Sequence, residues 1–491
     1  MTLTTRLLCG AAAALVAGCA LQPPYHRPDA PVTAAYPGGA AYRQPVAGPG
    51  ATTLPAAEIG WRDFLADARL QQLVGLALRN NRDLRVAVLN MEKARAQYQL
   101  QRAGLFPQLN AGADAARKGG PASVSAGTSY AASLSASWEA DFFGRLHSLS
   151  DSAAQQYLAS GYARQAAEIM LVANVADQYL TLLAYDEQLA VTQKTLEAAQ
   201  ASYKIVQLQF DTGTAPELDL RLAQTTVEQA QASHAAQVRL RAQAENALVL
   251  LVGQPLPPAA APSPSLAAEH ILADIPAGLP SELLVRRPDI LQAEALLRAE
   301  HADIGAARAA FFPQISLTAS LGSASSTLAG LFAAGTGAWA FAPSLLAPIF
   351  DAGANRARLD VAVLQKDIGV AQYEKAIQAA FREVADGLAA RGTYDEQLAA
   401  LQRNAGAQQR RLELANMRYA NGVDDYLNVL TAQTDLYNAQ SALVAARLNR
   451  LTSLVDLYRA LGGGWREHTG KPRAAPVADS GMLSRTPMER S

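Results

Sequence analysis

The sequence Tyr-Asp-Glu-Gln-Leu-Ala occupies residues 185–190 and recurs unchanged at residues 394–399, 209 positions later. Two Phe-Pro-Gln sequences, at residues 106–108 and 312–314, pair at a similar offset of 206. Further pairs at the offset of 209 are Phe210 with Tyr419, Gly213 with Gly422, and Leu218 with Leu427. Because chance similarity does not hold one register over so long a stretch, we interpret the chain as a tandem duplication.

Each repeat is predicted to begin with a helix, at residues 70–103 and 281–310. Pro288 is tolerated in the first turn of the second helix, and the Phe-Pro that follows each helix ends it. After each Phe-Pro, the period of the apolar residues changes to two, around residues 109–116 and 129–139 and again in the second repeat. This alternation predicts four strands of about 9–12 residues, each with an apolar and a small polar face.

Two long helices follow the strands of each repeat. Residues 145–210 contain no proline, which predicts a rod of about 100 Å at about 1.5 Å per residue. Its apolar positions recur every seven residues, at Val175, Leu182, Leu189, Leu196, Tyr203 and Phe210. The second repeat has a similar seam at Leu398, Leu401, Ala405, Leu412, Ala415 and Tyr419. Sustained heptads indicate coiled-coil packing, and Gly213 and Gly422 suit reversals into returning helices at 216–252 and 425–461.

The composition of the 491 residues excludes several classes of protein. The 42 basic and 43 acidic side chains leave a net charge of −1, which gives no electrostatic footprint for nucleic acid. The charged fraction of 17% is below the ~25% of typical soluble domains, so part of the chain is expected not to face water. Beyond the first twenty residues there is no apolar run of about 18 residues, so any membrane contact is expected to be made without helices.

The N-terminus reads as a targeting signal, with a basic start and an apolar stretch at residues 7–17. Leu15-Val16-Ala17-Gly18-Cys19 resembles a bacterial lipobox, which predicts S-diacylglycerol and N-palmitoyl groups on Cys19. Ala20 after the cysteine implies sorting to the outer membrane. The alternative is an ordinary signal peptide with a chance cysteine.

These signals divide the chain into six segments. They are a lipoprotein signal peptide (1–18), a lipid-anchored extended arm (19–65), a first repeat (66–253), a Pro-rich connector (254–280), a second repeat (281–464) and a disordered C-terminal tail (465–491).

Four strands cannot close a barrel, because about eight are needed and every backbone polar group in lipid must be paired. A membrane barrel must therefore be shared between chains: two chains give eight strands, and three give twelve with room for a pore. Trp138 and Trp339 stand where an aromatic belt would lie. The alternative is a half-buried soluble sheet that packs on the helices.

The chain resembles the TolC-like outer-membrane factors, and within them the OprM/NodT lipoprotein branch of resistance-nodulation-division efflux systems. The resemblance rests on the lipobox, the duplicated plan, residues 138–145 (Trp-Glu-Ala-Asp-Phe-Phe-Gly-Arg) and residues 418–423 (Arg-Tyr-Ala-Asn-Gly-Val). It implies an α+β membrane protein: a homotrimer with a 12-stranded β-barrel in the outer membrane, continued by a long α-helical coiled-coil barrel. It also implies a periplasmic adaptor (membrane fusion protein) and an inner-membrane transporter as partners, with a lipid anchor reaching into the outer membrane.

The resemblance places adaptor-facing hairpin tips at the reversals between long helices. The tip residues it implies are Gly213, Thr214, Leu218, Asp219, Gly422, Val423 and Leu427. Asp219, Asp424 and Asp425 are candidates for an acidic ring at the periplasmic aperture, although Asn428 and Thr431 stand where TolC itself has acids. The alternatives are plain helix reversal at the glycines and helix capping by the aspartates.

No pattern of catalytic or cofactor-binding residues is evident. The six histidines include no pair at metal-binding helical spacing, and neither a Walker A nor a GxSxG motif occurs. We therefore expect no enzyme activity, no metal and no cofactor besides the lipid on Cys19. The expected function is a passive efflux channel for small molecules such as antibiotics. The alternatives are a duct for type I secretion of proteins or peptides and a lipid-anchored periplasmic coiled-coil scaffold.

Overall fold

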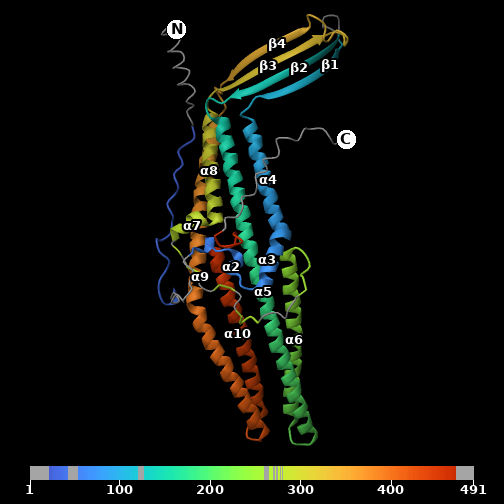
Figure 1. Cartoon of the computed structure of the whole chain (residues 1–491), viewed down its shortest axis with the longest axis vertical. Coiled ribbons are helices and arrows are strands. Elements are labelled where there is room, and N and C mark those ends of the chain that lie inside the picture. Colours follow the sequence, from blue (N-terminus) through green and yellow to red (C-terminus); the bar gives the residue numbers. More distant parts are fainter. Residues whose placement is uncertain are drawn as a thin grey trace. The chain divides into compact units, whose positions relative to one another are not determined.

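The structure is a computed structural model, and it describes residues 21–42, 54–119, 127–258, 265–268, 271–272, 275–276, 278 and 280–470. The chain forms two compact units (Figure 1). Among the described residues, those within 1–31, 87–163 and 289–376 form unit 1, and those within 32–86, 164–288 and 377–491 form unit 2. The signal peptide, Cys19 and residues 471–491 lie outside the described residues.

The two repeats form matching elements. The first contains α3 (Ala68–Asn80), α4 (Arg82–Ala103), β1 (Gln108–Lys118), β2 (Gly127–Ala140), α5 (Arg145–Asp211) and α6 (Glu217–Val252). The second contains α7 (Pro280–Arg286), α8 (Pro288–Ala309), β3 (Gln314–Ser325), β4 (Gly337–Leu346), α9 (Ala354–Ala420) and α10 (Tyr426–Ala460). The short helices η1 (Ala40–Tyr42), η2 (Ala56–Glu58) and α2 (Trp61–Phe64) precede them. Both long helices α5 and α9 have 67 residues, so the predicted rods and the duplication are confirmed.

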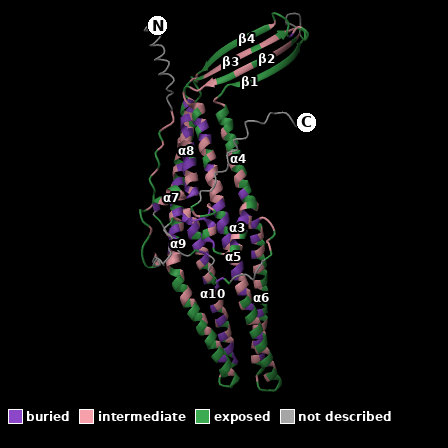
Figure 2. Ribbon diagram, viewed as in Figure 1, coloured by how far each residue is buried: buried purple, intermediate pink, exposed green. Residues whose placement is uncertain are grey.

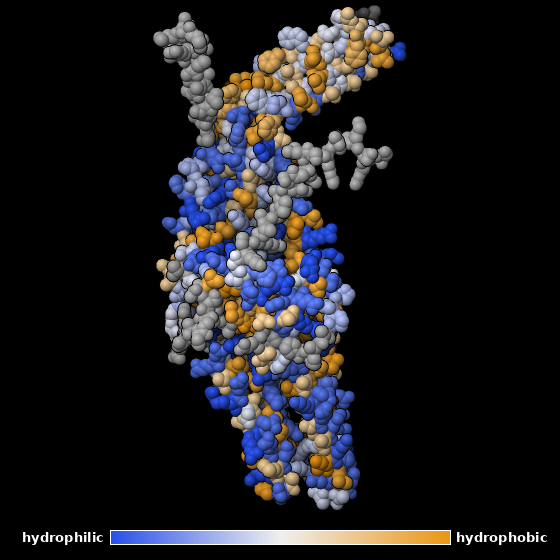
Figure 3. Space-filling model, viewed as in Figure 1, coloured by the Kyte–Doolittle hydropathy of each residue, from blue (hydrophilic) through white to orange (hydrophobic). Residues whose placement is uncertain are grey.

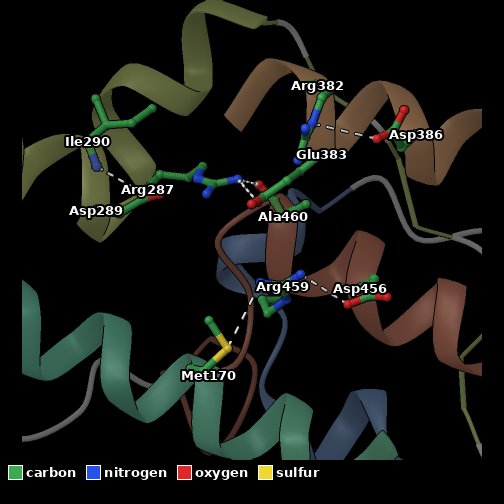
Figure 4. Close-up of polar contacts among 10 residues, drawn as sticks. All are labelled: Met170, Arg287, Asp289, Ile290, Arg382, Glu383, Asp386, Asp456, Arg459 and Ala460. Carbon is green, nitrogen blue, oxygen red and sulfur yellow. Dashed lines mark hydrogen bonds and ion pairs between the residues drawn. The ribbon is translucent and has the colours of Figure 1, made fainter. Parts of the chain in front are cut away.

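The predicted first helix of each repeat is in fact two helices, which is a correction. The breaks fall at Asn81 and Arg287, which match at the offset of 206. Asn81 accepts a hydrogen bond from the backbone N–H of Leu84 at 2.9 Å and donates to the carbonyl of Leu251 at 2.9 Å. Arg287 donates to the carbonyl of Ala460 at 3.0 Å and pairs with Glu383 at 2.8 Å (Figure 4).

Each break thus presents a side chain to a carbonyl in the last turn of α6 or α10. Such carbonyls have no partner within their own helix, so the break satisfies a group that would otherwise be buried unpaired. Pro288 is the first residue of α8, where its missing N–H costs nothing. The apolar period continues through both breaks, which is why the sequence pattern indicated one helix.

The four strands form one antiparallel sheet in the order β1-β2-β3-β4. Residues that face each other across neighbouring strands lie on the same side of the sheet. On one side, Leu134 lies between Ala111 and Leu321. Leu321 in turn faces Trp339 on β4. Small polar residues occupy the other side, where Ser135 lies between Asn110 and Ser320. The predicted strands and their two contrasting faces are confirmed, although β2 reaches 14 residues.

The core of unit 2 is formed by α3, α5 and α10, which appear purple in the middle of Figure 2. Leu73, Val175 and Leu180 are fully buried there, and the rings of Phe64 and Tyr458 stack at 3.9 Å. Farther along α5, the buried positions are Thr192, Ala199 and Val206, whereas Phe210 is 37% exposed. The seam predicted on α5 is therefore correct for its first half and wrong at Phe210. All six predicted seam residues of α9 are at least half-buried.

Residues 465–470 are ordered, which corrects the prediction of a disordered tail from residue 465. The backbone N–H of Trp61 donates to the carbonyl of Arg466 at 2.8 Å, and the N–H of Thr469 donates to Asp63 at 2.7 Å. Gly60 permits this approach, because a Cβ there would lie 2.4 Å from the backbone of His468. Backbone hydrogen bonds hold residues 465–470 against α2. Polar residues form such bonds as readily as apolar ones, so the polar composition of the segment did not predict that it is ordered.

The first described residues of the N-terminal arm, 21–31, lie against α8 in unit 1. Arg27 forms two hydrogen bonds with the buried carboxylate of Glu294, at 3.0 and 2.6 Å, and Tyr25 donates to the same group at 3.3 Å. The Tyr25 ring also meets His301 edge to face at 5.3 Å. These contacts make Glu294 the anchor of the arm.

Candidate functional site

Both hairpin tips have the same backbone. Gly213 and Gly422 adopt positive φ angles of 74° and 68°. One residue later, the N–H of Thr214 donates to the carbonyl of Gln209 at 2.7 Å, and the N–H of Val423 donates to that of Arg418 at 2.9 Å. This helix-ending motif favours glycine because other residues rarely adopt the left-handed conformation. The predicted reversals lie where the sequence placed them.

The tips are held together by a cluster that draws on four helices. Val206 of α5, Ala223 of α6, Ala415 of α9 and Tyr426 of α10 belong to one buried core. Tyr419 donates to the side chain of Gln209 at 2.7 Å, which joins α9 to α5. The two hairpins of one chain therefore pack as a pair near their ends.

Apolar side chains are exposed at equivalent positions on both tips. Leu218 is 67% exposed and Leu427 is 58% exposed. The residues Ile205 and Leu208 on α5, and their equivalents Leu414 and Met417 on α9, are exposed as well. Figure 3 shows apolar side chains at the ends of both hairpins. Sequence reasoning found Leu218 and Leu427 but missed the other four, although the offset of 209 links them in pairs.

The three acidic aperture candidates lie in different surroundings. Asp424 forms two hydrogen bonds with Arg418 of the same chain, at 2.6 and 2.9 Å, and these hold the pKa of its carboxyl below the usual range. Asp425 is exposed and occupies the N-cap position of α10, but its side chain accepts no capping bond. Asp219 is half-buried. The pKa of Tyr419 is raised mainly by the burial of its own ring and, to a smaller extent, by the negative charge of Asp219.

The other tip residues are accessible. Thr214, Gly213, Gly422 and Val423 are all exposed, and the Thr214 hydroxyl donates to the carbonyl of Gln209 at 2.9 Å. The roles of these residues toward an adaptor, and of the aspartates in an aperture, remain predictions.

Charged residues of the sheet in unit 1 lie only in β1 and β2. Asp114, Arg117 and Lys118 lie in the second half of β1, and Glu139 lies near the end of β2, where it pairs with Arg145 at 2.7 Å. β3 and β4 contain no charged residue. On the apolar side, Trp339 and Phe341 are 79% and 60% exposed in the single chain. A charge-free band with an exposed apolar face fits contact with lipid.

Within the residues that the structure describes, no group of three or more His, Cys, Asp or Glu side chains is arranged to hold a metal ion.

None of the helices in the described ranges combines the length and the apolar character needed to cross a membrane.

Comparison with known proteins decides the family. The family model for the outer membrane efflux protein matches residues 73–254 and 279–463, which is most of the chain. The chain belongs to the outer membrane efflux protein family. This confirms the resemblance at the level of the family and the expected function as an outer-membrane channel of an efflux system.

Relatives and solved structures agree along nearly the whole length. The toluene efflux pump outer membrane protein TtgC of Pseudomonas putida is 47% identical over 464 residues, covering 93% of this chain and 95% of the relative. Outer membrane protein OprJ of Pseudomonas aeruginosa is 46% identical over 469 residues, covering 93% and 96%. The open-state structure of the Neisseria gonorrhoeae MtrE outer membrane channel has a TM-score of 0.83 at 39% identity, covering 92% and 100%. The family and these relatives are transport proteins rather than enzymes.

Proposed function

We propose that three copies of this chain form a passive exit duct through the outer membrane for small apolar molecules. One observation carries the proposal: the sheet of each chain is open. Among the described residues, β1 and β4 each pair on one side only, and a strand edge inside a membrane must find a partner. Neighbouring strands alternate in direction through the order β1-β2-β3-β4, so β4 of one copy is antiparallel to β1 of the next copy. These two edge strands can therefore pair directly, and three copies close a twelve-stranded barrel.

Relatives suggest the class of solute. TtgC is named for toluene efflux, SrpC of Pseudomonas putida for solvent efflux, and ArpC for antibiotic efflux. We infer that this chain exports apolar solvents or antibiotics of similar character. These names favour an efflux duct over a duct for secreted proteins.

The energy for export must come from partners, which we propose are an inner-membrane transporter and a periplasmic adaptor. The tips offer the adaptor two equivalent apolar surfaces per chain, each centred on one exposed leucine, Leu218 or Leu427. Exposed apolar patches of this kind are typical of protein interaction sites. We further propose that diacylglycerol and palmitoyl groups on Cys19 anchor the N-terminus in the outer membrane, since stable anchoring needs more than one acyl chain.

The proposal is tested with a strain that lacks the gene and carries variants on a plasmid. Replacing Leu218 and Leu427 together by glutamate places charge on both tip surfaces, so we expect the cells to become as sensitive to toluene and antibiotics as the deletion strain. The matched control replaces both residues by methionine, which keeps the surface apolar and is expected to restore resistance.

Immunoblots of outer-membrane fractions must show equal amounts of all variants. Full resistance with the glutamate variant would contradict the role of the tips. Unchanged sensitivity on deletion of the gene itself would contradict the efflux function.

A further inference from the structure

The register of the sheet in unit 1 places every strand residue on one of its two sides, because side chains alternate along a strand and paired residues share a side. The strands contain four charged residues. Three of them lie on the polar side, namely Asp114, Lys118 and Glu139. Arg117 alone lies on the apolar side, which is the side that carries Trp339. Charged residues are unfavourable on a side that faces lipid, so this one arginine requires a partner.

The apolar side changes in character along the strands. β1 begins soon after α4 and runs away from it, so its first residues lie near the helices and Arg117 lies near the far end. The four rows of paired residues nearest the helices are apolar, and the fourth consists of Ala111, Leu134, Leu321 and Trp339. Farther out the rows become polar: Tyr130 pairs with Ser325, and in the last row Arg117 pairs with Thr128. Figure 3 shows blue, hydrophilic atoms at this end of the sheet.

Two aromatic residues of β2 mark the height of the apolar band. Trp138 and Tyr130 lie on the apolar side, eight positions apart, which is about 27 Å along a strand at about 3.4 Å per residue. A strand tilt of about 40° reduces this to about 21 Å across the membrane, close to the apolar band of about 25 Å that aromatic residues flank in membrane barrels. Arg117 lies one row beyond Tyr130. Its guanidinium therefore falls just outside the band, at the level of the lipid headgroups.

The guanidinium of Arg117 is available for a lipid. Arg117 is exposed, and no other residue in the described part of the chain forms a side-chain hydrogen bond or an ion pair with it. Asp114, the one acidic residue of β1, lies on the opposite side of the sheet. A guanidinium binds phosphate through two parallel hydrogen bonds, and phosphate is a charged group of lipid headgroups.

We propose that Arg117 binds a phosphate group of the glycolipid in the outer leaflet of the outer membrane, with the hydroxyl groups of Thr128 and Tyr130 beside it. The inference rests on the proposed barrel and adds the lipid that the barrel binds. The helices of the proposed duct lie in the periplasm, so the far end of the sheet faces the cell exterior, where the lipid carries phosphates on a sugar headgroup. Charge complementarity selects this occupant, because the strands place no acidic residue on this side.

The first experiment measures lipid binding to the assembly, purified from outer membranes in mild detergent and washed free of lipid. The probe is lipid A, an acylated glucosamine disaccharide with two phosphates, and native mass spectrometry counts the bound molecules during a titration. Arg117→Ala is expected to weaken binding about tenfold, because hydrogen bonds between charged groups are lost. Arg117→Lys keeps the charge without the paired hydrogen bonds, so its loss should be smaller.

The matched control is Lys118→Ala. Lys118 is the next residue of β1, is also exposed and has the same charge, but it lies on the polar side of the sheet. Its replacement is expected to leave lipid A binding unchanged. An equal loss in Lys118→Ala and Arg117→Ala would show a general effect of net charge and would overturn the inference.

The second experiment removes the phosphates from the probe. Dephosphorylated lipid A is expected to bind the unmodified chain about tenfold more weakly, and Arg117→Ala is expected to cause no further loss with this probe. Losses that add would show that the residue and the phosphates act independently, which would contradict the proposed contact. Inorganic phosphate at the same concentrations is expected not to displace lipid A, because it lacks acyl chains. Displacement would indicate a site for free phosphate instead of a lipid.

The outcomes separate the inference from the proposed function. If the unmodified chain forms trimers but Arg117→Ala binds lipid A as tightly as the unmodified chain, the inference is overturned and the proposed function stands. If the unmodified chain is a single copy in the membrane, the proposed barrel fails, and the inference fails with it.

Discussion

At the scale of the residue, Asn81 and Arg287 have the same task with different chemistry. Each occupies the break between two helices and donates to a carbonyl in the last turn of α6 or α10. Because asparagine and arginine are not similar residues, comparison of the two repeats did not show that these positions are equivalent. Only the packed structure brings each donor to the carbonyl at the end of its repeat.

Asn81 provides a direct test of this arrangement. Asn81→Ala removes the cap of α4 and leaves the Leu251 carbonyl without its donor, so we expect a loss of stability of about 1–2 kcal/mol. Thermal unfolding followed by circular dichroism should show the decrease. Asn81→Ser keeps an N-cap acceptor for the Leu84 N–H and brings no charge into this buried site, so its loss should be smaller. Equal melting temperatures for Asn81→Ala and the unmodified chain would contradict the assigned role.

At the scale of the element, the repeated hexapeptide has a structural explanation. Asp186 pairs with Arg241 at 2.8 Å, and the equivalent Asp395 pairs with Arg450 at 2.6 Å. Each pair joins a long helix to the helix that returns from its tip. The identical sequence therefore marks the same junction in both hairpins.

Elements with a strong local signal were predictable from the sequence. The strands begin at Gln108 and Gln314, directly after the Phe-Pro pairs, and the helix α5 begins at Arg145 as expected. What was missed depends on contacts far apart in the chain: the breaks at Asn81 and Arg287 and the ordered residues 465–470. At the tips, the glycines were evident, but the exposure of Ile205 and Leu208 follows from packing rather than from their apolar character.

The N-terminal arm is an element whose attachment depends on pH. Burial alone would raise the pKa of Glu294, but hydrogen bonds from Arg27 and Arg298 outweigh it and leave the pKa below the ordinary value. A lowered carboxyl pKa stabilises the folded state fully above the unfolded value of about 4.3, and this contribution is lost as the pH falls through the folded value. The protection of residues 21–31 against hydrogen exchange, taken relative to the intrinsic exchange rate at each pH, should therefore be higher at neutral pH than in acid below that range.

Glu294→Gln should release the arm even at neutral pH, because a neutral amide cannot form the ion pair with Arg27. Asp360→Asn, which removes an exposed acid on α9, is the matched control and should leave exchange in the arm unchanged. Slow exchange in Glu294→Gln at neutral pH would show that the arm is held by other contacts.

At the scale of the whole molecule, a single chain leaves exposed several surfaces that further copies could cover. Within the part of the chain that the structure describes, the sheet of unit 1 has two open edges, and Trp339 and Phe341 are exposed on its apolar side. In unit 2, Leu250 of α6 is 78% exposed, an unusual state for a leucine near the end of a long helix. Both features have the same explanation, because further copies of the chain would pair the strand edges and cover Leu250. The low charge of the sequence also fits surfaces that face lipid and other copies.

The most direct test of this account is the mass of the protein extracted from outer membranes in mild detergent, measured by native mass spectrometry. The account predicts an assembly of three chains, each heavier than the mature sequence from Cys19 by one diacylglycerol and one palmitoyl group. An unlipidated chain would contradict the anchor alone. A single chain, stable over a range of detergents and protein concentrations, would contradict the shared channel.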